Sequence, residues 1–198
     1  RTSGSIGRHP ADERQGTVAL GIVDAVADDE DVGDDEAGAV GIAALDADYG
    51  QRLRALQAVD EAVRKVHDAL KAAGRLDDTY VVFASDNGYH NGQHLLTAGK
   101  QLAYEEDIRQ PLLIRGPGVP ADAVLDHLVG NADLAPTIAA LAGIKPPVTV
   151  DGRSLAPLLS ATPPAVTGWR QALPLARWRI PNATADPWPE FTGLRTGR

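Results

Sequence analysis

The chain has 198 residues, 43% of them hydrophobic, and a formal net charge of −8, a length that suffices for one substantial core. It contains no cysteine, which excludes disulfides, thiolate metal ligands and a cysteine nucleophile. No run approaches the roughly 20 apolar residues of a membrane-spanning helix, and no basic stretch followed by an apolar one marks a signal peptide. We therefore expect a soluble chain, whose localisation the sequence leaves open.

The negative charge is concentrated at the N-terminus. The first fifty residues hold 12 acids and 3 bases, whereas the rest of the chain holds 15 acids and 16 bases. The near-neutral remainder has no basic stripe of the kind that nucleic-acid binding requires. We therefore expect neither nucleic acid nor a membrane as a partner, and the oligomeric state stays open.

Residues 1–47 are rich in Gly, Ala, Asp and Val, and an acidic run extends from Asp28 to Glu36. The apolar stretch from Thr17 to Val23, followed by Asp28 and Asp29, has two interpretations. It is either a strand that leads into paired carboxylates able to hold a metal, or part of a solvated acidic tract. The second is favoured because a block of like charges repels itself. We predict a disordered, low-complexity segment over residues 1–47.

A helix and a strand are predicted next. From Gln51, apolar residues recur at intervals of three and four with charged residues between them, which predicts an amphipathic helix that Gly74 ends. The run from Thr79 to Ala84 is β-branched and aromatic without alternation, as expected for a strand buried on both faces. The apolar positions of the helix are Leu53, Leu56, Val59, Val63, Val66 and Leu70.

The order of the later elements is typical of an α/β fold with a mostly parallel sheet. A second short strand is predicted over residues 111–115, where the leading proline suits a strand's first position. Asp133 is placed to cap a helix that Gly143 ends. Beyond Ser160 the composition shifts to Pro, Trp and Arg, and we predict the start of a small antiparallel subdomain over residues 161–198.

The segment from Ser85 to His94 begins where the first predicted strand ends, the place where open α/β sheets bind ligands. Asp86 and Asn87 offer two hard oxygen ligands to a divalent cation. Taken alone, however, Asp86-Asn87-Gly88 is better explained as an ordinary turn, since Asn-Gly is a common turn dipeptide. The four-residue spacing of His90 and His94 suits a metal site on a helix, but it also suits two unrelated loop histidines.

Lys100 follows a glycine shortly after this segment. Its ammonium group, carried back toward the same loop, would act as a compact point charge for an anionic substrate oxygen. The alternative is a surface lysine, which is the usual fate of lysine. We interpret Glu105, Glu106 and Asp107 as acids of a helix face or turn that Arg109 can pair with, rather than as catalysts.

Five blocks stand in order after Thr79: Ser85-Asp86-Asn87-Gly88-Tyr89-His90, Gly92-Gln93-His94, Gly99-Lys100, Tyr104-Glu105-Glu106-Asp107-Ile108-Arg109 and Pro111-Leu112-Leu113-Ile114-Arg115-Gly116-Pro117-Gly118. Together they resemble sulfatases of the alkaline-phosphatase-like superfamily, and the branch that includes N-acetylglucosamine-6-sulfatases in particular. The resemblance extends from about Tyr49 to Arg198 and corresponds to the C-terminal part of such an enzyme. It implies an incomplete alkaline-phosphatase-like sandwich, with residues 48–160 in the catalytic domain.

The resemblance also implies roles for single residues. Asp86 and Asn87 match the family's second pair of calcium ligands, and Lys100 matches the lysine that contacts the sulfate. His90 and His94 are similar to histidines that line the sulfate or sugar pocket, with His94 a candidate proton donor to the departing sugar oxygen. The implied cofactors are Ca²⁺, or another divalent cation, and a formylglycine that attacks sulfur.

The chain departs from the family in two important respects. It contains no convincing first strand that ends in the family's other two aspartate ligands, so half of the implied metal shell is missing. The family makes its formylglycine from a Cys/Ser-x-Pro-x-Arg motif, which this sequence lacks. We therefore expect a fragment of a sulfuric ester hydrolase that binds a cation and a sulfated carbohydrate or aryl sulfate ester but is inactive alone. Two alternatives are a phosphoester or phosphonate hydrolase of the same superfamily and a noncatalytic remnant that binds sulfated glycan or cations.

Overall fold

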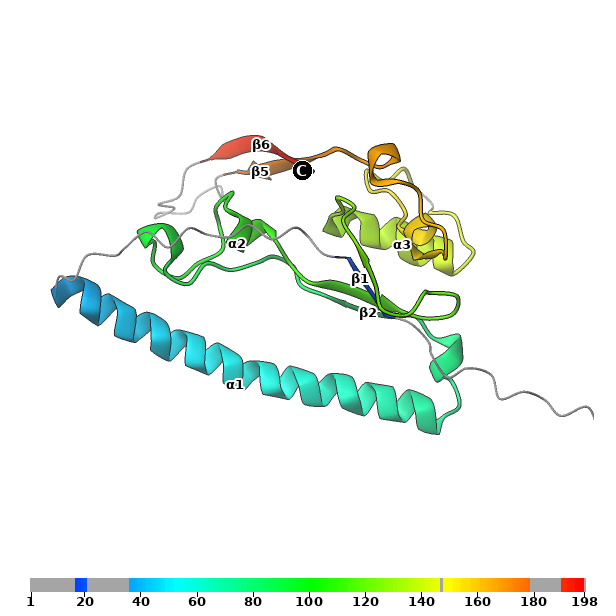
Figure 1. Ribbon diagram of the computed structural model, residues 1–198, viewed down its shortest axis with the longest axis horizontal. Coiled ribbons are helices and arrows are strands. Elements are labelled where there is room, and N and C mark those ends of the chain that lie inside the picture. The colour runs from blue at the N-terminus through cyan, green and yellow to red at the C-terminus, as the bar shows by residue number, and fades with distance from the viewer. Residues whose placement is uncertain (1–16, 21–35, 147, 179–189, 198) are drawn as a thin grey trace, which may run out of the picture.

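A computed structural model of the chain describes residues 17–20, 36–146, 148–178 and 190–197. A long helix, α1 (Glu36–Ala72), lies along one side of a sheet, and α3 (Leu134–Leu141) lies on the other side (Figure 1). A two-stranded sheet of β5 (Ala172–Arg177) and β6 (Phe191–Thr196) lies above α2 (Glu105–Ile108). The fold is α/β, as predicted, with a small antiparallel sheet near the C-terminus.

The main sheet is mixed. Its order is β2-β3-β1-β4, formed by β1 (Thr17–Leu20), β2 (Val81–Ala84), β3 (Leu112–Arg115) and β4 (Ala123–Leu125). β3 runs antiparallel to both β2 and β1, and among the described strands only β1 and β4 are parallel. The mostly parallel sheet is therefore not confirmed, because an apolar run reports burial and carries no information about strand direction.

Burial also differs between the two predicted strands. In β3, Leu112 and Ile114 are buried while Leu113 and Arg115 are half-buried, so this strand alternates. Val82 and Phe83 in β2 are each 37% exposed. The prediction that β2 is buried on both faces is wrong. Val82 and Phe83 are consecutive and so point to opposite faces of the sheet, and both are partly exposed to solvent.

Helix α1 begins at Glu36, not near Gln51, so residues 36–47 are helical rather than disordered. Its C-terminus is closed as predicted. Gly74 adopts a positive φ of 65°, and the N–H of Arg75 donates to the Leu70 carbonyl oxygen at 2.9 Å. Such a bond satisfies one of the carbonyl groups that a helix end leaves without a partner.

The strand at Thr17–Leu20 is a second difference from the sequence prediction. These residues pair with both β3 and β4, so they belong to the sheet and not to a solvated acidic tract. Asp28 and Asp29, the candidate paired carboxylates after this strand, lie outside the described residues.

The hydrophobic core lies between the main sheet and the layer that contains α3 and the 3₁₀ turn Ala156–Leu159. Ile114, at the centre of the sheet, is fully buried, and the indole N–H of Trp169 donates to the Leu128 carbonyl oxygen at 3.0 Å. The buried members are Leu112, Ile114, Val119, Val129, Leu155, Leu158, Leu159 and Trp169.

Asp133 stands at the N-terminus of α3, as predicted, but its carboxylate does not cap that helix. Instead it accepts two hydrogen bonds from the guanidinium of Arg170, at 2.6 and 2.7 Å, and one each from the N–H groups of Gly130 and Arg153. The buried carboxylate thus joins three separate segments. This network fixes the loop that precedes α3, and Asn131 in that loop contacts the candidate site.

Candidate functional site at the end of β2

The loop after β2 is held from two sides. Within the loop, the Ser85 hydroxyl donates to the Asn87 carbonyl oxygen at 2.9 Å. From the loop before α3, the Asn131 amide donates to the carbonyl oxygens of Ser85 and Asp86, at 3.1 and 2.9 Å. Gln110 also hydrogen bonds to the Asn131 side chain. The bonds to the loop itself use its backbone oxygens, and the Asp86 carboxylate lies on the surface.

Lys100 returns to this loop. Its Nζ atom lies 3.4 Å from Asp86 Oδ2, and the two side chains are 50% and 79% exposed. Partial desolvation raises the pKa of Asp86, but the charge of Lys100, its hydrogen bond and nearby backbone N–H groups outweigh that effect and lower the pKa below its ordinary value of 3.8. Asp86 is therefore an anion at neutral pH, and it shares one surface with the ammonium group.

The donors present fit part of a divalent cation site. Asn87 donates its side-chain N–H to the Gly88 carbonyl oxygen at 2.5 Å, which leaves its amide oxygen as the group available to a cation beside the Asp86 carboxylate. Calcium takes roughly six to eight oxygen ligands. The described residues contain no cluster of three or more acidic, histidine or cysteine ligands, so this pair supplies two ligands of a larger set.

His90 lies inside the protein and not on the surface of the site. It is 0% exposed, and its Nδ1 and Nε2 atoms lie 2.5 Å from Asp107 Oδ1 and 2.9 Å from the Thr97 carbonyl oxygen. Its backbone pairs with Gly99 in an antiparallel bridge. His90 therefore acts as a clamp: its ring contacts and its pairing with Gly99 hold together the two ends of the loop from Gly88 to Lys100.

His94 stands on the same loop in a left-handed conformation, with φ 59° and ψ 26°, which is uncommon for a residue with a side chain. Its ring stacks on Tyr104 at 3.7 Å between centroids, and its Nε2 atom lies 3.3 Å from Glu106 Oε2. The ring is partly exposed, so it remains accessible. Its described contacts are with α2 and Tyr104, not with Asp86 or Lys100.

Asp107 holds this region together, although its sequence context predicted only an acid of a helix face or turn. Its carboxylate is buried and accepts from the Leu102 N–H at 2.7 Å as well as contacting His90, and its carbonyl oxygen accepts from the Gly88 N–H at 2.7 Å. Spacing could not distinguish it from Glu105 and Glu106. Only its position on the inner side of the single turn α2 does so.

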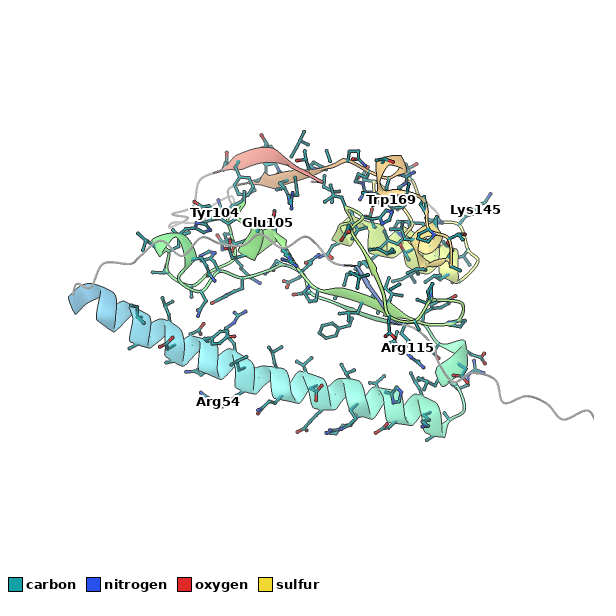
Figure 2. The ribbon with its side chains drawn as sticks, viewed as in Figure 1. Arg54, Tyr104, Glu105, Arg115, Lys145 and Trp169 are labelled. Atoms are coloured by element: carbon teal, nitrogen blue, oxygen red, sulfur yellow. The ribbon has the colours of Figure 1, made fainter. Side chains whose placement is uncertain are left out.

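Helix α1 supports the outer side of the loop. The Asn91 amide donates to the Leu45 carbonyl oxygen at 3.2 Å, and the Arg52 guanidinium lies 3.5 Å above the Tyr89 ring. Figure 2 shows the neighbouring Arg54 on the opposite side of the helix, pointing away from the sheet. Helix α1 thus supports the candidate site both through Leu45, in the part predicted to be disordered, and through Arg52, in the part predicted to be helical.

A pocket of about 270 Å³ opens next to Lys100. One wall is the segment from Lys100 to Leu102, and the other is the β5–β6 hairpin. Tyr104 and Glu105 lie on the side of the loop that faces this hairpin (Figure 2). The lining residues that bear on function are Lys100, Gln101, Ile108, Leu175, Arg177 and Phe191.

Residues 8–144 match the family model described as Sulfatase. The chain belongs to the sulfatase family. Sulfatases are hydrolases, so the chain belongs to a family of enzymes. The matched span contains all five candidate residues of the site, namely Asp86, Asn87, His90, His94 and Lys100.

Curated sulfatases share substantial identity with this one. The Drosophila melanogaster extracellular sulfatase SULF-1 homolog is 50% identical over 109 residues, which cover 55% of this chain and 10% of the relative. The human N-acetylglucosamine-6-sulfatase is 44% identical over 116 residues, covering 58% and 21%. The chain therefore spans between a tenth and about a fifth of the length of these two relatives.

Solved structures show the same fold. BT4656, solved in complex with its substrate D-glucosamine-2-N,6-O-disulfate, is 32% identical with a TM-score of 0.64 over 72% of this chain and 28% of that one. A phosphonate monoester hydrolase from Silicibacter pomeroyi is 36% identical with a TM-score of 0.55 over 60% and 23%. No helix in the described part of the sulfatase chain is long and apolar enough to cross a membrane.

Proposed function

We propose that the chain is the part of a sulfuric ester hydrolase that binds the sulfate ester and half of a divalent cation site. The observation that carries this proposal is the 3.4 Å contact between Lys100 Nζ and Asp86 Oδ2 at the carboxyl end of β2. It brings an ammonium group and a carboxylate together on one accessible surface, although 14 positions separate them. A site that binds a sulfate ester beside a divalent cation needs both groups, the ammonium for a sulfate oxygen and the carboxylate for the cation.

Each residue has a distinct role in this proposal. Lys100 holds a non-bridging oxygen of the ester, while the oxygens of Asp86 and Asn87 hold the cation, for which Ca²⁺ is the expected ion. A bound cation would supply positive charge for the negative charge that develops on the sulfate oxygens. His94, accessible and turned toward α2, is the candidate proton donor to the departing sugar oxygen. His90 holds the loop.

The proposed substrate is a sulfated carbohydrate, and an aryl sulfate is the simpler alternative. The human relative is named for N-acetylglucosamine 6-sulfate, a Volvox carteri relative is named an arylsulfatase, and BT4656 was solved with a disulfated glucosamine. Because the chain has no cysteine and no Ser-x-Pro-x-Arg motif, it holds no formylglycine precursor. We therefore propose that it binds the ester without hydrolysing it.

Calorimetric titration of the chain with glucosamine 6-sulfate in the presence of CaCl₂ tests the proposal. Lys100→Ala should weaken ester binding by about tenfold, since it removes a charge-assisted hydrogen bond. Lys65→Ala is the matched control, because Lys65 is an exposed lysine of α1 paired only loosely with Glu61 at 3.9 Å. Equal affinities of the parent and Lys100→Ala would contradict the role of Lys100.

A turnover assay tests the missing nucleophile separately. The chain should release no nitrophenol from p-nitrophenyl sulfate above the uncatalysed background. Turnover that Lys100→Ala abolishes would show that another residue performs the nucleophilic step.

A second candidate, binding of a phosphonate monoester, is favoured by the solved phosphonate monoester hydrolase with 36% identity. The same titration with phenyl sulfate and with a phenyl phosphonate monoester distinguishes the two. The sulfatase proposal expects tighter binding of the sulfate. Binding of Ca²⁺ or glycan without any dependence on Lys100 would instead favour a noncatalytic remnant.

A further inference from the structure

Asn131 holds the chain at the point where β2 ends. Its side-chain nitrogen donates to two consecutive carbonyl oxygens, those of Ser85 and Asp86, at 3.1 and 2.9 Å. In an extended strand, consecutive peptide groups point in opposite directions, so one donor does not reach two neighbouring carbonyl oxygens. The contact therefore belongs to the bend that the backbone makes at Asp86, shortly after the last residue of β2.

This bend matters to the two candidate cation ligands. In a continuous strand, the side chains of Asp86 and Asn87 would point to opposite faces of the sheet. One cation, however, needs the oxygens of both around it. The bend removes the alternation, and the Ser85 hydroxyl secures it from within the loop by donating to the Asn87 carbonyl oxygen at 2.9 Å.

A second carboxamide orients Asn131. Gln110 Nε2 donates to Asn131 Oδ1 at 2.5 Å, and Asn131 Nδ2 donates back to Gln110 Oε1 at 3.2 Å. Because carbonyl oxygens only accept hydrogen bonds, this reciprocal pair keeps the Asn131 nitrogen, and not its oxygen, toward the end of β2. Gln110 lies between α2 and β3, so the pair also joins the end of one strand to the start of its neighbour.

The loop that carries Asn131 is fixed independently of the site. The buried Asp133 carboxylate accepts from the Gly130 N–H at 2.9 Å, from the Arg153 N–H at 2.7 Å and from the Arg170 guanidinium. Asn131 itself is exposed, so its amide contributes hydrogen bonds rather than core packing. It therefore reaches the end of β2 from a base that does not depend on it.

We propose that Asn131 is a positioning residue of the cation site, which holds the bend at Ser85 and Asp86 so that the oxygens of Asp86 and Asn87 are presented together. This inference rests on the proposed function, since it concerns the same cation, and adds the residue that prepares the site for it. Residues that orient a metal ligand without touching the metal typically change metal affinity by about 10- to 100-fold. Asn131 acts through the backbone, so we expect the lower end of that range.

Titration of the ¹⁵N-labelled 198-residue chain with CaCl₂, at constant ionic strength, tests this inference. The NMR signals of the amide groups of Asp86, Asn87 and Gly88 report binding at the site itself. Asn131→Ala should raise the Kd for Ca²⁺ about tenfold. Gln110→Ala should raise it by a smaller factor, and the double variant should bind no more weakly than Asn131→Ala, because both changes act through one contact.

Three further variants separate positioning from direct ligation and from stability. Asn131→Asp keeps the shape of the side chain but removes the donor, so it should weaken Ca²⁺ binding as Asn131→Ala does. Val129→Ala removes packing from the buried core next to this loop, so it should lower the melting temperature and leave the Kd of the folded chain unchanged. Gln57→Ala, on exposed α1, should change neither quantity.

Each contrary result has a separate meaning. An Asn131→Ala chain that binds Ca²⁺ as tightly as the parent would overturn the positioning role while the proposed function stands. Tighter binding by Asn131→Asp would make Asn131 a ligand of the cation, which also overturns that role. A parent whose Asp86 and Asn87 signals do not respond to Ca²⁺ would refute the proposed cation site, and this inference with it.

Discussion

At the scale of single residues, His90 is enclosed by two oxygen atoms. The Thr97 carbonyl oxygen can only accept, so Nε2 carries the proton that it donates there. On the other side of the ring, Nδ1 lies 2.5 Å from Asp107 Oδ1. The ring therefore links Asp107 to the backbone at Thr97, at the base of the loop that presents Lys100.

Replacing the His90 ring should leave the Asp107 carboxylate buried with fewer partners. We expect His90→Phe to lower the free energy of unfolding by about 3–5 kcal/mol, the usual cost of breaking a buried pair. Urea denaturation followed by circular dichroism measures this change. His67→Phe, at an exposed position of α1, is the control and should shift the unfolding free energy by less than about 0.5 kcal/mol. Equal stability of both variants would contradict the clamp.

Gly88 lies tightly against the backbone of α2 and of Arg109, the residue after it. A Cβ atom at this position would lie 2.0 Å from the Glu106 carbonyl oxygen and 2.3 Å from that of Arg109. Both atoms belong to the backbone, so neither can rotate away.

The substitution Gly88→Ala should therefore destabilise the chain by about 3 kcal/mol or more, because the loop must move away from α2. Thermal unfolding of Gly88→Ala measures the loss. Gly168→Ala, where a Cβ would meet no atom within 4 Å, is the matched control and should leave the melting temperature nearly unchanged. A Gly88→Ala chain as stable as Gly168→Ala would contradict the tight loop–helix contact.

At the scale of elements, α1 is the most exposed part of the described structure. The apolar residues at helical spacing along it remain between 41% and 55% exposed, although the same spacing predicted a buried face. Packed contacts of α1 are concentrated near Leu45, Arg52 and its C-terminal turn. A stripe this long is unusual on the surface of a soluble protein. Its members are Ile42, Tyr49, Leu53, Leu56, Val59, Val63 and Val66.

The apolar stripe should make the chain self-associate and bind the dye 8-anilinonaphthalene-1-sulfonate. Introducing two charges with Val59→Lys and Val63→Lys should lower the dye fluorescence severalfold and shift sedimentation toward the monomer. The control carries Asp60→Lys and Arg64→Lys on the charged face, and it should leave both signals near those of the parent. Unchanged dye binding in the stripe variant would show that another surface is responsible.

At the scale of the whole molecule, Asp133 joins segments that lie far apart in the chain. Burial raises the pKa of its carboxyl group, but the hydrogen bonds from Arg170 and from the N–H groups of Arg153 and Gly130 lower it further, so the net pKa lies below 3.8. Arg170 responds in the opposite sense, because the carboxylate beside it raises the pKa of the guanidinium.

The direction of this shift determines a pH dependence. An acid whose pKa is lower in the folded state stabilises the fold fully above its unfolded pKa of about 3.9 and loses that contribution as the pH falls through the folded pKa. The melting temperature of the parent should therefore fall steeply below about pH 4. Asp133→Asn should lower the free energy of unfolding at pH 7 by about 3–5 kcal/mol. Its melting temperature should also change less than the parent's between pH 4 and pH 3. An identical slope in both proteins would assign the acid sensitivity to other carboxylates.

The sequence by itself determined the features that depend on near neighbours. The three- and four-residue spacing located most of α1, the apolar runs located β2 and β3, and the glycines at 74 and 143 marked helix ends that the structure confirms. The ordered blocks from Ser85 to Gly118 indicated the family. All of these follow from backbone preference or from short spacing.

Only the tertiary structure decided the direction of β3, the membership of Thr17–Leu20 in the sheet and the burial of His90. It also decided that Asp107, rather than its two acidic neighbours, holds the loop, and that Arg177 reaches the pocket beside Lys100. The physical reason is common to these features. Strand pairing and side-chain enclosure depend on residues brought together from distant parts of the chain, and a local pattern carries no information about which those residues are.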